Sequence, residues 1–385
     1  MKTYVTGMAR TRTGERWDVS IRDLAAEAAE EALDDAQTDR VGAIVVGNML
    51  SGPLASQENL ATIVADAAGL VGVEAIKVEA ACASGASAIR VANALVASGE
   101  HDSVLVVGVE KMTDTSPGHT TAALSLAADG DYEALHGATF PALVALMMRA
   151  YMEKYGYDRR DFAGFSVNAH KNAMGNPKAM LRRPITEEDY MKAPIVSSPM
   201  GVMDSAPICD GAAAIVITAE GRFDRRQDRP AVRLLGSAGA TDTAAVATRR
   251  DPLWLEAAYR SAKRAYQLAG VGPDDIDVFE AHDAFPAITV LALEASGFAK
   301  PGQGVMLAKC DEICLRGRLP ISTMGGLKAR GHPVGATGVY QAVEACLHLR
   351  GEGGSNQVEN ARIAMAQNIG GSAACIVTSI YGRED

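Results

Sequence analysis

Apolar and polar residues follow two different patterns in the first part of the chain. Residues 21–36 carry apolar side chains at helical spacing with acidic residues on the opposite face, which predicts an amphipathic helix. Residues 103–109 are almost wholly apolar, a pattern typical of a strand buried on both faces of a sheet. Strands are expected also at 3–9 and 41–50, and a helix at 60–68. This alternation of strands and helices along the chain predicts an α/β domain.

The same order of elements returns after residue 232, which indicates a duplicated architecture. The predicted helix 256–269 corresponds to helix 21–36, and the predicted strand 276–281 corresponds to the strand that begins at residue 41. The second half continues with a helix at 287–296 and strands at 361–367 and 375–381. Two α/β units of matching order are expected to pack together, with their equivalent turns facing one site.

The stretch between the halves does not follow this alternation. Residues 111–205 contain a segment rich in Thr, Ser, Gly and Asp, followed by predicted helices at 142–155 and 159–174. Regular order resumes with a strand at 212–218, and the charged residues 221–230 are typical of a linker. We therefore expect an irregular region inserted into the first half.

Composition limits the classes of function. The 385 residues are 48% apolar, enough for a large core, and the formal net charge of -10 argues against general nucleic-acid binding. The six cysteines show no paired metal-binding spacing, so we expect reduced thiols and a cytoplasmic protein. The N-terminus lacks the apolar region of a signal peptide, and no apolar run reaches the roughly 18 residues of a membrane span.

One cysteine follows the apolar stretch 75–81 and precedes a helical pattern of small residues, 84–97. Cys82 is thereby expected at or just before a helix N-terminus, where free backbone N–H groups and the helix dipole favour an anion. The thiolate is the nucleophilic form of cysteine, so this position favours a nucleophile. A buried structural cysteine is the alternative interpretation.

A matching turn lies near the other end of the chain. A short strand-like run, 319–323, leads into a Gly-rich turn that contains His332 and Pro333, and a helical pattern, 338–349, follows. Histidine is the side chain best suited to move protons near neutral pH. The surrounding glycines allow the backbone to approach a ligand closely, which favours a functional histidine over a structural one.

These two turns and two further segments together resemble the thiolase family of Claisen-condensing enzymes. The motifs, in the family's order, are Glu280-Ala281-His282-Asp283-Ala284-Phe285, Gly331-His332-Pro333 with Gly335-Ala336-Thr337-Gly338, and Gln367-Asn368-Ile369-Gly370-Gly371-Ser372. The His-Asp-Ala-Phe form is similar to the archaeal and sterol-carrier-type branch, whereas the common bacterial form is Asn-Glu-Ala-Phe. The resemblance covers essentially the whole chain.

The resemblance implies a fold and a domain organisation. The thiolase fold is α/β, with two duplicated halves that form a five-layered αβαβα core and a loop domain inserted into the first half. On this sequence the halves would be residues 1–225 and 226–385, and the inserted loop domain would be about 112–205. The irregular region described above fits that insertion.

The resemblance also implies roles for single residues. Cys82 would attack the acyl donor, and the backbone of Cys82 and Gly370 would form one oxyanion hole. His332 would form the other, aided by a water that His282 holds, and would help to activate Cys82. Coenzyme A thioesters would be the substrates, with no metal and no further cofactor. The residue types agree, because acyl transfer needs a thiolate, oxyanion donors, a base and an acid.

The sequence departs from the family at the second catalytic cysteine. The common pattern has Cys-Ile-Gly-Gly where Asn368 stands, and the sterol-carrier-type branch has His-Asp-Cys-Phe where Ala284 stands. Cys375 lies in an apolar strand run and is interpreted as a packed core residue. Either a histidine replaces the missing thiol, with His282 as first candidate and His136 as second, or the reaction differs in detail.

A loose basic cluster, Lys171, Lys178, Arg182 and Arg183, lies in the inserted region, and its last three members are the candidate ligand contacts. One interpretation is a solvated face, as for most groups of surface charges. The other is a contact for the phosphate groups of coenzyme A, because charge-assisted hydrogen bonds to phosphate are strong.

The expected activity is that of an acyl-CoA C-acetyltransferase, which condenses two acetyl-CoA to acetoacetyl-CoA and coenzyme A, or runs the reverse thiolysis, through an acyl-Cys82 intermediate. The alternatives are an acyltransferase of the same fold with a non-CoA acceptor, a non-catalytic subunit that binds acyl-CoA or a lipid, and a thiolase-like aldolase. The resemblance further implies a homodimer or homotetramer, and assembly with a small OB-fold partner and a hydroxymethylglutaryl-CoA synthase.

Overall fold

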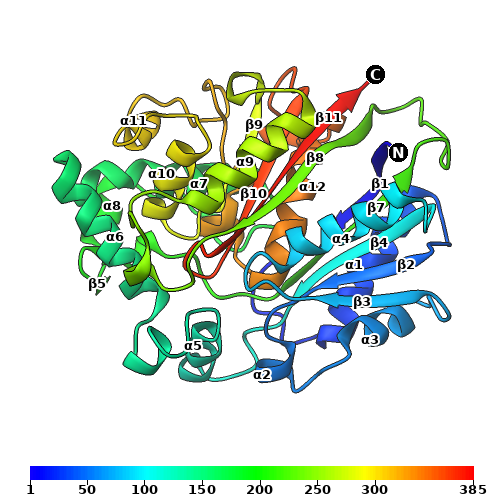
Figure 1. Ribbon diagram of the computed structural model, residues 1–385, viewed down its shortest axis with the longest axis horizontal. Coiled ribbons are helices and arrows are strands. Elements are labelled where there is room, and N and C mark those ends of the chain that lie inside the picture. Colours follow the sequence, from blue (N-terminus) through cyan, green and yellow to red (C-terminus); the bar gives the residue numbers. More distant parts are fainter.

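A nine-stranded mixed sheet runs through the computed structural model, which describes residues 1–385 (Figure 1). Its strand order is β3-β2-β4-β7-β1-β8-β11-β10-β9. The first half contributes β1 (Thr3–Arg10), β2 (Ala43–Gly47), β3 (Glu74–Val78), β4 (Ser103–Glu110) and β7 (Gly211–Ala219). The second half contributes β8 (Ala231–Thr241), β9 (Val278–Glu280), β10 (Ile363–Gly370) and β11 (Cys375–Glu384).

The two halves repeat one topology on either side of the β1–β8 junction. In each half the outer strands are parallel, as β2 is to β4 and β9 is to β10, and the inner strands are antiparallel. The expected strand at 319–323 is wrong, because the structure has only a single bridge there, between Phe279 and Ile321. Ser322 has a left-handed φ of 49°, which turns the chain before a second ladder position can form.

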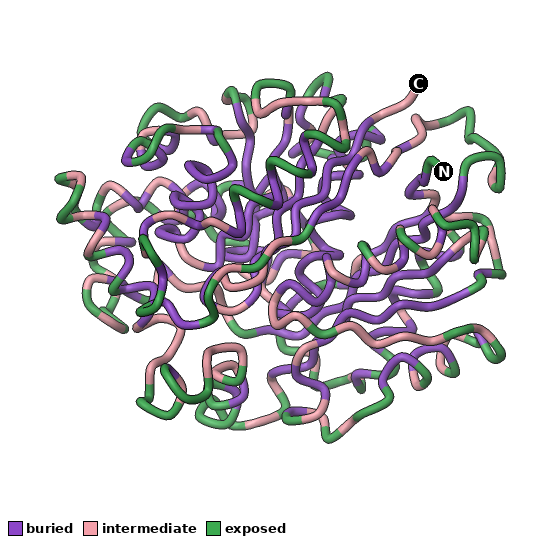
Figure 2. The backbone as a smooth tube through the Cα atoms, viewed as in Figure 1, coloured by how far each residue is buried: buried purple, intermediate pink, exposed green.

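Helices lie in three layers around the sheet and produce the expected αβαβα order. α1 (Ile21–Ala36) and α3 (Leu60–Ala67) cover the outer face of the first half. α4 (Ser84–Ser98) and α12 (Thr337–Arg350) pack against each other between the two half-sheets. α9 (Glu256–Ala269) and α10 (Pro286–Ala295) cover the outer face of the second half. The strands between these layers are the most continuously buried part of the chain (Figure 2).

The first helix illustrates how the residue pattern sets these boundaries. Its N-cap Ser20 accepts a hydrogen bond from the backbone N–H of Asp23 at 3.1 Å, which satisfies one free donor of the first turn. The small side chains of Ala28 and Ala32 are fully buried, so the helix approaches the sheet closely. Gln37 ends the helix in the left-handed conformation with φ of 55°.

The irregular region lies between β4 and β7 and projects from the second half-sheet at the left of Figure 1. It contains α5 (Pro117–Ser125), α6 (Phe140–Tyr155), α7 (Ala163–Ala173), α8 (Glu187–Lys192), β5 (Ile195–Ser197) and β6 (Met200–Gly201). The short helices α2 (Ser51–Ala55) and α11 (Gly304–Lys309) lie outside it. None of the helices combines the length and apolar character needed to cross a lipid bilayer.

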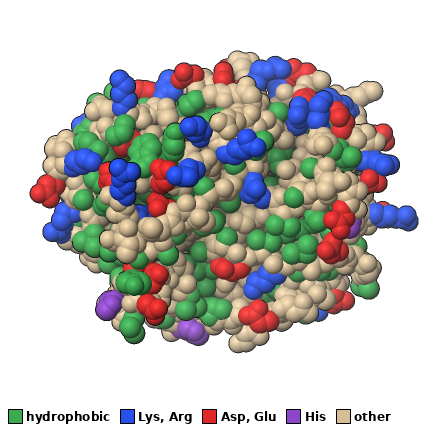
Figure 3. All heavy atoms as spheres, in the orientation of Figure 1, with side chains coloured by type: hydrophobic (Ala, Val, Ile, Leu, Met, Phe, Trp, Pro, Cys, Tyr) green, Lys and Arg blue, Asp and Glu red, His purple; other side chains and the backbone are tan.

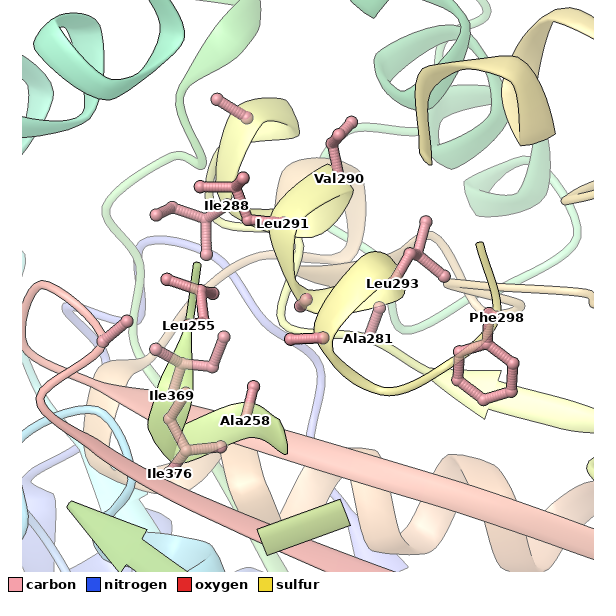
Figure 4. Close-up of a cluster of buried hydrophobic side chains, with 14 of the residues drawn as sticks. Leu255, Ala258, Ala281, Ile288, Val290, Leu291, Leu293, Phe298, Ile369 and Ile376 are labelled. Atoms are coloured by element: carbon pink, nitrogen blue, oxygen red, sulfur yellow. The ribbon is translucent and has the colours of Figure 1, made fainter. Parts of the chain in front are cut away.

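The largest apolar cluster ties the inserted region to the second half. Figure 4 shows Ile288 of α10 near Leu255, with Ile369 of β10 and Ile376 of β11 below them. Leu143 and Val144 of α6 belong to the same cluster, so the insertion shares a core with the second half. On the face shown in Figure 3, positive and negative side chains are interspersed.

Candidate active site

A cavity of about 210 Å³ brings together Cys82, His282 and His332, which the sequence places far apart. Its wall is mainly apolar, because α6 contributes Phe140 and Val144 and α10 contributes Ile288. Further lining comes from α5, from residues 205–208 and from the end of β10. A site of this shape, apolar with a few convergent polar groups, is typical of a small-molecule pocket.

Cys82 lies on a tight turn between β3 and α4, as expected. Ala81 adopts a left-handed φ of 51°, and its neighbour Ala80 donates its N–H to the hydroxyl of Ser84 at 2.9 Å. Ala83 is the N-cap of α4, so Cys82 precedes the first helical residue by two positions. At this turn Cys82 lines the cavity and also packs against a small apolar cluster that includes Met112 and Val334.

The protonation state of Cys82 differs from the expectation. Burial, followed by the negative charge of Glu110, raises the pKa of the Cys82 thiol to about 12. The backbone N–H groups of Cys82 and Gly371 lower this pKa, but by less. The helix start therefore does not hold a thiolate in the free protein, because removal of water from the sulfur outweighs the nearby N–H donors. A base must take the proton before the sulfur can attack.

His332 follows a π-helix, Gly326–Arg330, and lies just before α12. Gly331 has a φ of 123°, and a Cβ at this position would lie 2.8 Å from the sulfur of Cys209, so only glycine fits. Nδ1 of His332 lies 2.7 Å from the hydroxyl of Thr337, the first residue of α12. Burial, with the charges of His282 and Arg330, lowers the pKa of His332 well below its usual value.

The carboxylate of Glu110 joins the loop that follows β2 to the His332 turn. It lies at the end of β4 and accepts N–H groups of Met49 at 2.9 Å, Leu50 at 3.0 Å and Gly335 at 2.9 Å. Gly335 belongs to the His332 turn of the second half, whereas the other donors belong to the first half. Residue patterns did not identify Glu110; the only signal was a single acid that ends a wholly apolar strand.

The starts of the two central helices touch through glycines. A Cβ on Gly85 would lie 2.8 Å from the carbonyl oxygen of Gly335 and 3.1 Å from the backbone nitrogen of Gly338. A Cβ on Gly338 would lie 2.3 Å from the backbone nitrogen of Ala86. Side chains at these positions would force α4 and α12 apart, and Cys82 and His332 with them.

His282 lies after β9, in the loop that leads into α10, and its side chain is buried. Its ring meets the ring of His332 edge to face, with centroids 5.2 Å apart and planes at 88°. Its Nδ1 lies 3.1 Å from the side-chain nitrogen of Asn368 and 3.3 Å from the backbone nitrogen of Ile369. Burial, with the charge of Arg330, lowers the pKa of His282 to about 3, so the ring is neutral.

The turn after β10 packs directly on the Cys82 turn. A Cβ on Gly370 would lie 2.4 Å from the carbonyl oxygen of Ala80, so this position has no room for a side chain. The next residue, Gly371, has a φ of 60° and provides the N–H that influences the Cys82 sulfur. The oxyanion role expected for Gly370 stays a prediction.

Other candidate residues lie away from the cavity wall. His136 is exposed, and Cys375 pairs with Gly370 at the start of β11 without lining the cavity. Lys178 donates a hydrogen bond to the carbonyl of Arg10, pairs with Glu31 at 3.6 Å and lines a separate groove. Arg182 and Arg183 are exposed outside the cavity, and a contact of this basic cluster with coenzyme A phosphates stays a prediction.

One surface group offers three potential metal ligands. Glu74, Glu100 and His101 place their ligand atoms within 4.8 Å of one another. His101 is hydrogen-bonded to Glu74 at 2.9 Å, which accounts for their proximity. None of the three lines the cavity that contains Cys82.

Comparison with known proteins agrees with this geometry. A family model for the N-terminal domain of thiolase matches residues 3–221, and one described as thiolase C-terminal domain-like matches residues 238–383. The chain belongs to the thiolase family. This confirms the resemblance drawn from the four motifs, and the thiolase fold with it.

Two relatives identify the branch. The chain is 42% identical over 381 residues to an acetyl-CoA acetyltransferase of Methanothermobacter thermautotrophicus, covering 98% of this chain and 99% of that protein. It is 32% identical over 374 residues to sterol carrier protein 2 of Bos taurus, covering 92% of this chain and 67% of that protein. This thiolase is therefore an acyltransferase similar to archaeal and sterol-carrier-type members.

A solved structure of an Ltp2-ChsH2(DUF35) aldolase shares the fold of this thiolase. The two chains superimpose with a TM-score of 0.86 over 99% of this chain and 98% of the other, at 23% sequence identity. A likeness at this identity establishes the fold alone. The residues of the cavity, and not the fold, carry the information about function.

Proposed function

We propose that this thiolase condenses two acetyl-CoA molecules to acetoacetyl-CoA and coenzyme A, and runs the reverse thiolysis, through an acyl group on Cys82. One observation carries the proposal: a single apolar cavity holds Cys82, His282 and His332. A nucleophile, a proton acceptor and hydrogen-bond donors are the groups that acyl transfer requires. The acetyl-CoA acetyltransferase relative supports the choice of acetyl-CoA as substrate.

In this proposal, acylation uses the groups that the two turns provide. His332 removes the proton of Cys82, whose thiol is otherwise protonated at neutral pH. The sulfur attacks the thioester carbonyl of acetyl-CoA, and the N–H groups of Cys82 and Gly371 stabilise the developing negative charge. The coenzyme A thiolate leaves and takes the proton from His332. The products are acetyl-Cys82 and coenzyme A, with His332 neutral again.

Intact-protein mass measurement after addition of acetyl-CoA tests the proposal. We expect a mass increase of one acetyl group, mapped to the peptide that contains Cys82, and acetoacetyl-CoA in the solution. The Cys82→Ala protein is the matched control and should show neither. A label on Cys209 or Cys375, or no label at all, would contradict the assignment.

We also propose that this thiolase assembles with further chains. β3 is one of the two edge strands of the sheet, so its outer backbone groups are available to a second copy. The Ltp2-ChsH2(DUF35) aldolase structure contains a thiolase-like chain with a partner, which supports a small partner protein here. Light scattering of the purified chain, alone and co-expressed with a DUF35 protein, measures self-association and partner binding. A monomer under both conditions contradicts the proposal.

A further inference from the structure

The two histidines of the cavity make their protein hydrogen bonds through Nδ1. His282 uses Nδ1 toward Asn368 and Ile369, and His332 uses Nδ1 toward Thr337. In each ring Nε2 is the nitrogen left for a ligand. A neutral imidazole carries one proton, so the partner of Nδ1 decides whether Nε2 donates or accepts a hydrogen bond.

The partner of His282 is a donor. The backbone nitrogen of Ile369 always carries its proton, so at 3.3 Å it requires a lone pair on Nδ1 of His282. The amide nitrogen of Asn368, at 3.1 Å, donates to the same atom. The single proton of His282 is therefore on Nε2, which faces the cavity as a hydrogen-bond donor.

The partner of His332 is an acceptor. The hydroxyl of Thr337 has one proton and donates it to the carbonyl oxygen of Pro333, 3.1 Å away. Its oxygen then accepts from Nδ1–H of His332 at 2.7 Å. Nε2 of His332 therefore has a lone pair, so the two rings have opposite tautomers fixed by neighbouring protein groups.

We propose that His332 is the only proton acceptor for both half-reactions, and that His282 is a fixed hydrogen-bond donor that never serves as a base. This rests on the proposed function. It explains how the chain works with Asn368 and Ala284 at the two positions where a second cysteine would be expected. It differs from the expectation that His282 takes over the acid and base role of that cysteine.

The condensation step balances with these two residues. Neutral His332 removes one α-proton from the second acetyl-CoA, and the electron pair of that C–H bond forms an enolate. Nε2–H of His282 stabilises the enolate oxygen. The enolate carbon then attacks the carbonyl of acetyl-Cys82, the C–S bond breaks, and the Cys82 thiolate recovers the proton from His332. Acetoacetyl-CoA and the starting enzyme are the products.

The remaining titratable groups near the cavity are occupied. The carboxylate of Asp283 accepts the N–H of Leu327 at 2.7 Å, and Glu110 is surrounded by N–H donors. Neither carboxylate lines the cavity, and Cys375 does not line it either. Burial lowers the pKa of both histidines, which keeps the Nε2 lone pair of His332 available at neutral pH.

Exchange of the α-protons of acetyl-CoA in D2O, followed by mass spectrometry, isolates the base. All variants are made in the Cys82→Ala protein, which cannot form the acyl-enzyme. We expect exchange in Cys82→Ala. Adding His332→Ala or His332→Gln should lower the exchange rate by about 10²-fold or more, which is the usual effect of losing a base. Adding His282→Asn should keep most of the exchange, because an amide N–H replaces the donor, whereas His282→Ala should not.

Each outcome decides the inference. No exchange in Cys82→Ala alone would show that His332 does not remove the α-proton by itself, and would overturn the inference. Three other results would also overturn the inference. The first is exchange that survives both His332 variants, and the second is an equal loss of exchange in His282→Asn and His282→Ala. The third is exchange that vanishes when Cys375→Ala is added. Circular dichroism confirms that each variant is folded. Absence of acetyl-Cys82 and of acetoacetyl-CoA in the wild-type protein would instead contradict the proposed function, so the two failures are distinguishable.

Discussion

The hydroxyl of Thr337 lies 2.7 Å from Nδ1 of His332, which leaves Nε2 as the ring nitrogen without a protein partner. Thr337 is the first residue of α12, and its hydroxyl donates a hydrogen bond to the carbonyl oxygen of Pro333. The contact links the start of α12 to the ring of His332, the base of the proposed mechanism. Thr337 was part of a recognised motif, but the residue pattern alone attached no role to it.

Thr337→Val keeps the shape of the side chain and removes the acceptor for Nδ1–H. We expect single-turnover acylation of Cys82 to slow on the order of 10²-fold, because His332 then has no partner that keeps its lone pair on Nε2. Thr337→Ser retains the hydroxyl and should stay near the wild-type rate. KM for acetyl-CoA should not change in either variant. An equal loss in the Ser and Val variants would show that the hydroxyl has no such role.

Alkylation of Cys82 by iodoacetamide should follow the raised pKa of its thiol. With a pKa of about 12, the thiolate population increases about tenfold per pH unit from pH 7 to 9, and the alkylation rate with it. Peptide mapping gives the rate at Cys82, and exposed Cys310 in the same sample is the internal reference. A rate at Cys82 that is already constant near pH 7 would reveal a thiolate–imidazolium pair and contradict this prediction.

Gly85→Ala should destabilise the junction of the two halves. The added methyl group would lie 2.8 Å from the carbonyl oxygen of Gly335, an overlap that typically costs about 1–3 kcal/mol. Denaturant unfolding and single-turnover acylation should both show a loss, because the displaced turn carries His332. Gly118→Ala is the matched control, since a Cβ there meets no atom within 4 Å and α5 tolerates alanine. Equal unfolding midpoints for both variants would contradict the expected clash.

His348 provides a pH test of stability outside the cavity. Burial lowers the pKa of His348 to about 4, so the unfolded chain binds the proton more tightly than the folded one. Its contribution to stability is complete above pH 6.5 and decreases as the pH falls towards 4, by about 1.4 kcal/mol per pH unit.

His348→Gln removes the titrating imidazole and keeps an N–H donor for the hydroxyl of Thr323. In the wild-type protein this hydroxyl lies 2.6 Å from Nε2 of His348. The difference in unfolding free energy between wild type and variant should therefore shrink between pH 6.5 and 4. Denaturant unfolding at a series of pH values measures it. A difference that stays constant across this range would show that the native His348 titrates normally.

Local patterns predicted the elements that depend on local order. The 3.6-residue period gave the bounds of α1 and α9, Ile21–Ala36 and Glu256–Ala269, as the structure has them. A continuous apolar run predicted β4, because a strand buried on both faces needs no polar side. The run 319–323 looked like a strand for the same reason, but its pairing depended on the left-handed Ser322 and on a distant neighbour.

Residue order alone was enough to predict the family, the duplicated α/β order and the positions of Cys82 and His332 at the starts of two helices. The chemistry of these two residues depends on the folded chain. The thiol of Cys82 is protonated because distant segments remove water from it, and the proton of His282 is placed by the backbone of Ile369, 87 residues away in the chain. Dehydration and hydrogen-bond direction depend on which distant groups come into contact in the folded chain, and residue patterns do not reveal those contacts.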